Sequence, residues 1–200
     1  MNQTKQTKTR TNKLVKIAIL SAIAFVVMLF EFPLPFLVPS FIKLDFSDLP
    51  ALIAAFSLGP IAGVICELLK NLLYIIIRGT QSAYVGEFAN FLIGSSLCLT
   101  AGIIYNIRKT KKMALISLGV ATVIMALVGC ILNYFVLLPF YENAMNFPIS
   151  AIVDAAHAVN SIVTDKFTLI LFAILPFNLL KGIVISIITF IVYKSISKIL

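Results

Sequence analysis

The stretch that decides the fold is TLILFAILPFNLLKGIVISIITFIVY, residues Thr168 to Tyr193. This apolar run is long enough to cross a bilayer as a helix, and its only charge, Lys181, falls near the middle. A lone ammonium in hydrocarbon costs on the order of 2.5 kcal/mol or more, so it marks a candidate functional site. Asn178 lies three residues earlier, on the same helical face. The sequence therefore predicts a polar pocket for a small molecule inside the membrane. The alternative is that Lys181 pairs with an intramembrane glutamate such as Glu67 and only neutralises it.

The composition of the chain indicates an integral membrane protein with one compact helical domain. Hydrophobic residues make up 60% of the 200 residues, and the mean hydropathy is +1.06. The net charge of +8 does not indicate a nucleic-acid partner, because the charges cluster at the ends of apolar runs. The cysteines Cys66, Cys98 and Cys130 lie singly in three different runs, so we expect buried, reduced thiols and no metal site.

Six apolar runs predict an all-α membrane protein with six transmembrane helices, at 14–30, 49–58, 61–77, 84–107, 113–138 and 168–193. The second run is too short to cross upright, and the basic residues decide its status. If it crosses, eleven of them lie on one side, which is then the cytoplasm. These residues are Lys5, Lys8, Arg10, Lys13, Lys16, Arg108, Lys109, Lys111, Lys112, Lys194 and Lys198. We therefore expect six crossings with the N- and C-termini cytoplasmic.

Two parts of the chain differ in composition. Residues 1–13, rich in Thr, Gln and Lys, have nothing to bury and predict a mobile basic cytoplasmic tail. Residues 14–200 form a single six-helix transmembrane substrate-binding domain, whose first span is retained because no convincing cleavage site follows it. Within that span Ala18 and Ala22 lie one turn apart near the cytoplasmic end. They suit either internal packing or a docking face for another membrane protein.

Two outer loops have features expected around a ligand. The first, 31–47, contains three prolines and leads into the run KLDFSDLP at 43–50. Ser47 or Asp48 can cap the short helix that follows, which leaves unexplained the group Lys43, Leu44, Asp45 and Phe46. The second loop, 78–86, has two glycines and small polar residues around Tyr84, as expected of a gate. Within 139–166 an apolar face at Ile149, Ile152, Val153, Ala156 and Val163 predicts a short interfacial helix.

The polar residues inside the predicted spans suggest what the pocket binds. They are Glu67, Lys70, Asn71, Glu87, Asn90, Asn133, Asn178 and Lys181. Glu67 and Lys70 can neutralise one another, and Asn90 and Asn133 can hydrogen-bond between helices. Amides beside a cation also suit an imide edge, because asparagine both donates and accepts while an ammonium satisfies a carbonyl oxygen.

Missing motifs narrow the function further. The chain has no G-x-x-x-x-G-K-[ST] phosphate loop, so it cannot hydrolyse ATP itself. It has no H-E-x-x-H and no carboxylate pair at catalytic spacing, so we assign no catalytic residue and expect no enzymatic activity. No inverted repeat is evident, which disfavours a secondary transporter that works alone.

Four stretches in combination resemble one known family. They are KLDFSDLPAL at 43–52, LGPxxG at 58–63, GEFANFLIG at 86–94 and PFNxxKG at 176–182. Together they look like the riboflavin-specific substrate-binding (S) component of energy-coupling factor (ECF) transporters. The resemblance covers roughly 14–107 and 132–193 and extends neither to the tail nor to most of 142–166.

The resemblance implies a vitamin-binding subunit in the cell membrane that docks on a transmembrane coupling (T) protein carried by two cytoplasmic ATPases. It implies that Ala18 and Ala22 contact the coupling protein. The ligand would be riboflavin, transported and not held as a cofactor, with its imide edge on Asn133, Asn178 and Lys181. The full set of candidate substrate-binding residues is Asn178, Lys181, Asn133, Asn90, Glu87, Lys43, Leu44, Asp45, Phe46 and Tyr84.

Three other functions remain open at this point. One is an S component for another vitamin such as thiamine or biotin, one is a self-sufficient small membrane carrier or channel, and one is a membrane enzyme or assembly factor. A flavin-type absorption spectrum of the purified chain separates riboflavin binding from all three.

Overall fold

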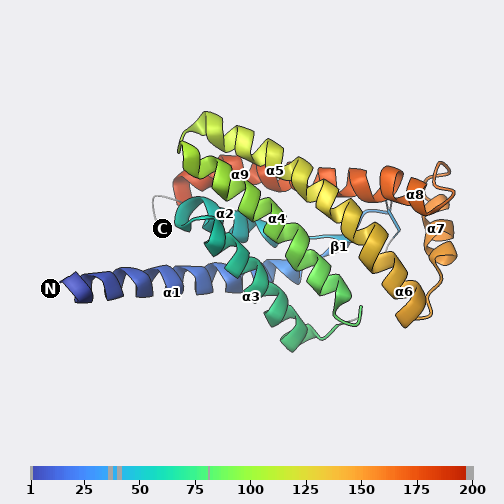
Figure 1. The fold of residues 1–200 in the computed structure, drawn as a ribbon, viewed down its shortest axis with the longest axis horizontal. Helices are drawn as coiled ribbons and strands as arrows, with labels where there is room; N and C mark the ends of the chain where they lie inside the picture. Colours follow the sequence, from blue (N-terminus) through green and yellow to red (C-terminus); the bar gives the residue numbers. More distant parts are fainter. Residues whose placement is uncertain (1, 36–37, 40–41, 81, 197–200) are drawn as a thin grey trace.

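The computed structural model describes the chain except residues 1, 36–37, 40–41, 81 and 197–200, and the described part is a bundle of helices (Figure 1). The main helices are α1 (Asn2–Met28), α2 (Asp48–Leu58), α3 (Pro60–Arg78), α4 (Val85–Ile107), α5 (Lys111–Leu132) and α9 (Leu175–Ile196). The smaller elements are β1 (Phe32–Pro33), β2 (Lys43–Leu44), η1 (Asn133–Leu137), α6 (Leu138–Ala144), α7 (Ile149–His157), α8 (Lys166–Leu169) and η2 (Ile170–Ile174).

Five helical stretches in the described chain are long and apolar enough to cross a membrane, and α2 is a shorter apolar helix. The five are Arg10–Met28, Pro60–Arg78, Val85–Ile107, Lys111–Ala144 and Lys166–Tyr193. The all-α membrane fold expected from the sequence is thus confirmed, and each predicted run corresponds to a helix. Helix α1 already begins at Asn2, so the backbone of the expected tail is helical, while its mobility stays a prediction.

Helix α2 is short and is preceded by extended backbone. Strands β1 and β2 pair antiparallel, with Phe32 opposite Leu44, in the connection from α1 to α2. Most of α2 is buried by the other helices, from Pro50 to Phe56. Backbone without helical hydrogen bonds is tolerated at membrane depth only where protein covers it or it lines a cavity. Helix α2 and the residues just before it, Leu44, Asp45 and Ser47, therefore form part of the interior, whereas β1 is exposed.

Small residues allow α2, α3 and α4 to approach closely. A Cβ atom added at Gly63 of α3 would lie 2.8 Å from the Cβ of Ala55 and 2.9 Å from that of Cys98. Ala51 and Ala55 of α2 are fully buried. Packing of this kind replaces the hydrophobic driving force that lipid does not provide, and it fixes α2 inside the bundle.

Two prolines are each preceded by a π-helical turn. Turn η1 comes before Pro139 and turn η2 before Pro176. Proline lacks an N–H and its ring collides with the carbonyl four residues earlier, so a regular α-helix cannot continue unchanged through it. The wider turns let the helical path run from Lys111 to Ala144 and from Lys166 to Ile196. Single π-turns are frequent at functional sites, and η1 begins at Asn133, one of the candidate residues.

Two hydrophobic clusters hold the described part of the molecule together. The larger is formed by the long helices and α2. The smaller joins the α1–α2 connection to α6, α7, α8 and η2. Helix α7 confirms the short helix predicted in this region, and its apolar residues Ile152, Val153 and Ala156 are buried in the smaller cluster. Its apolar face therefore packs on protein, not on the membrane interface as expected.

Candidate ligand-binding site

A cavity of about 210 Å³ lies beside the smaller hydrophobic cluster, between the α1–α2 connection, α4, η1 and α9. Its polar lining includes six of the candidate residues, Lys43, Asp45, Asn90, Asn133, Asn178 and Lys181. The rest of its wall is mostly apolar and aromatic, with Tyr141 and Phe177 among its members. An apolar cavity with a few convergent polar groups is typical of a small-molecule site.

Two of the amides lining the cavity are fixed by their own helices. The side chain of Asn178 donates from Nδ2 to the carbonyl of Ile174 at 2.9 Å, and that of Asn133 donates to the carbonyl of Gly129 at 2.8 Å. Each amide has a second N–H and an oxygen with two lone pairs, which remain for a ligand. Gly129 also makes room for Asn178. A Cβ atom added at Gly129 would lie 2.9 Å from Nδ2 of Asn178.

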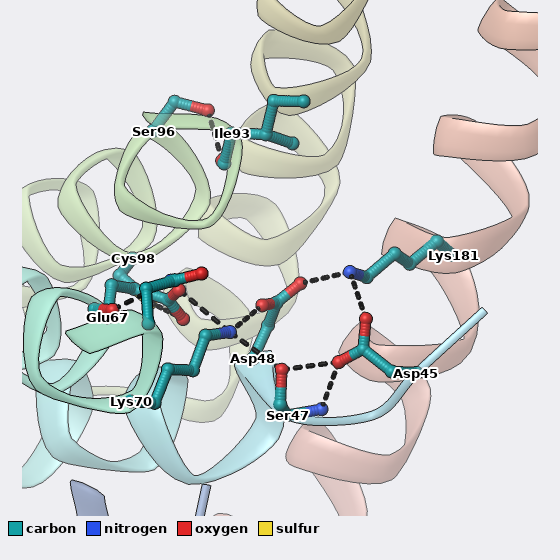
Figure 2. A network of polar contacts seen from close by, with 10 residues as sticks. Asp45, Ser47, Asp48, Glu67, Lys70, Ile93, Ser96, Cys98 and Lys181 are labelled. Carbon is teal, nitrogen blue, oxygen red and sulfur yellow. Dashed lines mark hydrogen bonds and ion pairs between the residues drawn. The ribbon is translucent and has the colours of Figure 1, made fainter. Parts of the chain in front are cut away.

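Lys181 is buried and forms ion pairs with two carboxylates. Its Nζ lies 3.0 Å from Oδ2 of Asp45 and 3.0 Å from Oδ2 of Asp48, as Figure 2 shows. The alternative in which Lys181 pairs with Glu67 is therefore wrong. An ammonium has three N–H donors, so two acidic partners leave one donor for the cavity that Lys181 lines.

A second lysine continues this network away from the cavity. Lys70 of α3 pairs with Oδ1 of Asp48, lies 2.8 Å from Oε2 of Glu67 and donates to Oγ of Ser47 at 2.8 Å. The predicted neutralisation of Glu67 by Lys70 is confirmed. We call Asp45, Asp48, Glu67, Lys70 and Lys181 the charge cluster; it joins the α1–α2 connection, α2, α3 and α9 (Figure 2).

The capping role expected for Ser47 or Asp48 is wrong. Ser47 occupies the position before α2, but its side chain makes no capping hydrogen bond with that helix. Its backbone N–H donates to Oδ1 of Asp45 at 2.8 Å, and its hydroxyl donates to the same oxygen. Burial by itself raises the pKa of Asp45, but the ammonium of Lys181, with Lys70 and Ser47, outweighs burial and holds that pKa below its usual range. Asp45 is therefore a fixed anion at the cavity wall.

An adjoining polar cavity of about 320 Å³ shares part of this wall. Both cavities are lined by Lys43, Asp45, Gly86, Asn90 and Tyr141. Glu87 lines the second cavity, where its Oε2 accepts from Thr80 at 3.0 Å and from Ser82 at 2.7 Å. These bonds tie the expected gate loop to the start of α4. Lys43 pairs with Glu31 at 2.7 Å on the same side.

Three candidate residues line neither of these cavities. Leu44 is buried in the smaller hydrophobic cluster, and Phe46 packs its ring 5.8 Å from that of Phe32. Tyr84 is 60% exposed and precedes α4 with a positive φ of 71°. A contribution of these three residues to ligand binding stays a prediction. The geometry supports it less than it supports a contribution of the residues that line the cavities.

Reasoning from the sequence missed Asp48, Tyr141 and Phe177. Asp48 was assigned to a helix cap, although an acid five residues after Lys43 in an apolar context could also have been paired with an intramembrane lysine. Tyr141 fell in the expected loop 139–166, because the predicted span ended at residue 138. Phe177 adjoins Asn178 and carried no signal distinct from other aromatic residues in the span.

The two alanines of the expected docking face, Ala18 and Ala22, are exposed on α1. Ile17, Leu20, Ser21 and Ala24 are buried on the opposite side of the same helix. Ala22 lies in a shallow apolar groove with Ile19, Ile23, Val26 and Val27. The two alanines are thus not used for packing within the described chain.

Comparisons with known proteins agree with this architecture. The model of the family described as ECF transporter, substrate-specific component matches residues 12–193. The riboflavin transporter RibU of Staphylococcus aureus is 43% identical over 100% of this chain and 98% of its own. The riboflavin transporter FmnP of Bacillus subtilis is 39% identical over 90% of this chain and 88% of its own.

Solved structures give the same result. The S component of a bacterial ECF transporter is 41% identical and superposes with a TM-score of 0.73, covering 95% of this chain and 98% of that one. ThiT of Listeria monocytogenes has a TM-score of 0.57 over 94% of this chain and 96% of that one, and at 16% identity it shows the fold alone. The chain belongs to the substrate-specific components of ECF transporters.

Proposed function

We propose that this chain binds riboflavin and serves its uptake as the S component of an ECF transporter in the bacterial cell membrane. The observation that carries the proposal is the convergence of Asn133, Asn178 and Lys181 on one cavity. These side chains offer the donors and acceptors that the imide edge of the flavin ring needs. The curated relatives named as riboflavin transporters support the same ligand.

The geometry favours one orientation of the ligand. The remaining N–H of Lys181 donates to a ring carbonyl, the amides of Asn133 and Asn178 bond the rest of the imide edge, and Phe177 provides an apolar surface for the ring. The ribityl hydroxyls then extend toward the adjoining cavity, whose lining includes Glu31, Lys43, Arg78 and Glu87. Charged and polar walls suit hydroxyl groups, whereas they disfavour the apolar ring.

The six-crossing topology with both termini in the cytoplasm is part of the proposal. Figure 1 places the N-terminal part of α1, the turn from α4 to α5 and the last part of α9 at one end of the bundle. Basic residues occur in all three segments of the sequence, with Lys13, Arg108 and Lys194 as examples. The positive-inside rule assigns this end to the cytoplasm, and the cavities then open toward the outside.

Energy for transport comes from other subunits in this proposal. The sequence has no phosphate loop, so ATP is hydrolysed by two cytoplasmic ATPases that carry a transmembrane coupling protein. The exposed Ala18 and Ala22 provide the docking face for that coupling protein. Small residues on an exposed helix face let a partner helix approach closely in lipid. The chain itself has no enzymatic activity.

Titration of the purified chain with riboflavin tests the proposal. We expect a flavin absorption spectrum and saturable quenching of flavin fluorescence, with thiamine and biotin failing to compete. Binding of either competitor in place of riboflavin would contradict the ligand assignment. Accumulation of riboflavin by liposomes containing this chain alone would instead indicate a self-sufficient carrier.

A further inference from the structure

The charge cluster contains one more acid than it has bases. Asp45, Asp48 and Glu67 face Lys70 and Lys181, and all five side chains are at least nine-tenths buried. Neutralising one acid therefore leaves a carboxylate beside each ammonium. For example, without the charge of Asp48, Lys70 keeps Glu67 and Lys181 keeps Asp45. Pairing each ammonium with an acidic side chain thus does not require Asp48.

The position of Asp48 explains its presence better than its charge does. It is completely buried at the start of α2 and bridges two helices, with one oxygen toward Lys70 of α3 and the other 3.0 Å from Nζ of Lys181 of α9. Figure 2 shows Asp48 between the two lysines. Lys181 lines the cavity together with Asp45, whereas Asp48 is not among the residues that line it. Asp45 is supplied by an irregular connection, whereas Asp48 belongs to a packed helix.

We propose that Asp48 is a positioning residue for the ligand: anchored by Lys70, it fixes the ammonium of Lys181 so that the remaining N–H donor faces the cavity. The inference rests on the proposed function. A lysine has a long flexible stem, and ordering it at the moment of binding costs conformational entropy. Holding it in place before the ligand arrives removes that cost from the binding step.

The competing interpretation is that the cluster only neutralises buried charges. Two substitutions separate the interpretations, because each replaces one acidic side chain of the cluster by its amide. Asp48→Asn removes a partner of Lys181, whereas Glu67→Gln changes a residue that contacts Lys70 and leaves both partners of Lys181 in place. Both variants are assayed as purified full-length chains in detergent, with thermal unfolding measured beside riboflavin titration.

We expect Asp48→Asn to weaken riboflavin binding about tenfold to a hundredfold, as for loss of a hydrogen bond to a charged group, while the chain stays folded. Glu67→Gln should bind as the wild type does. In a Lys181→Met background, Asp48→Asn should cause no further loss, because the group it positions is gone. Unchanged binding by Asp48→Asn, or equal losses in the two single variants, would overturn the proposal.

A second pair of substitutions applies if Asp48→Asn does not fold. Asp48→Glu and Glu67→Asp each move a carboxylate by one methylene and keep its charge. Loss of affinity in Asp48→Glu alone is the expected result, and equal affinities overturn the proposal. A wild-type chain that binds no riboflavin overturns the proposed function and this inference with it.

Discussion

The charge cluster and the amides lining the cavity are two ways of placing polar groups inside the same bundle. In the cluster, each ammonium is matched by carboxylates of neighbouring elements. Among the described residues, the amides of Asn133 and Asn178 are hydrogen-bonded to carbonyls of their own helical stretches. Groups that satisfy one another hold helices together, whereas groups with hydrogen-bonding capacity left over can bind a ligand. Lys181 belongs to both regions, because it pairs with two acids and lines the cavity.

This difference predicts different consequences of substitution. Removing one partner from a buried ion pair costs about 3–5 kcal/mol of stability, because it leaves an uncompensated charge. Removing a side chain that bonds only its own helix costs stability much less, but it removes contacts from the ligand. Substitutions of the cluster lysines should therefore lower stability, and substitutions of the amides should mainly lower affinity.

The largest effect is expected for Lys181→Met, which changes both properties. Asp45 and Asp48 lose their shared ammonium, so the free energy of unfolding should fall by about 3–5 kcal/mol. Riboflavin binding should weaken at least tenfold, since a charged donor to the ligand is also lost. Thermal unfolding and fluorescence titration in detergent measure the two effects on one preparation.

The double variant Lys181→Met/Asp48→Asn sharpens this result. It restores the original excess of one acid over the bases in the cluster, so part of the lost stability should return. Riboflavin affinity should not return. Recovery of both properties together would indicate that Lys181 contributes to folding only, and recovery of neither would contradict the charge balance.

An intermediate effect is expected for Asn178→Ala. The side chain lines the cavity and its Nδ2 bonds the carbonyl of Ile174 in its own helix. Affinity should fall roughly tenfold, with only a small change in the unfolding temperature. Asn143→Ala is the matched control, because Asn143 makes the same kind of bond to Pro139 at 2.8 Å but is exposed outside the cavity. Equal affinities of the two variants would remove Asn178 from the site.

The helical spans and the polar residues that line the cavity could be predicted because both are local properties. Apolar runs of sufficient length reveal spanning helices, and Asn178 with Lys181 reveals a polar face within one of them. The partner of Lys181 could not be found in this way. Asp45 is 136 residues away in sequence and reaches Lys181 through a connection that enters the bundle as extended backbone. The sequence of that connection has no helical or strand periodicity that would reveal where it lies.

The helix around Asn133 illustrates a second limit. The predicted span ended at residue 138, just before Pro139, and a proline normally indicates the end of a helix. The π-turn η1 instead carries the helical path past the proline to Ala144, which brings Tyr141 to the cavity wall. Whether a proline ends a helix or is absorbed by a wider turn depends on tertiary contacts, such as those of η1 with η2, and not on the proline itself.

The smallest effect on ligand binding is expected for Ala22→Trp. This substitution should nevertheless abolish assembly of the chain with the coupling protein. Ala22 is exposed on α1, and its side chain takes no part in either of the two polar cavities. A bulky ring at this position blocks close approach of a partner helix without disturbing a site built from other elements. We expect the variant to bind riboflavin as the wild type does and to fail to co-purify with the coupling protein and its ATPases.

Val120→Trp, on the exposed face of α5, is the control and should retain both riboflavin binding and assembly. Loss of riboflavin binding together with assembly would show that Ala22 is needed for folding, and full assembly would show that the docking face lies elsewhere.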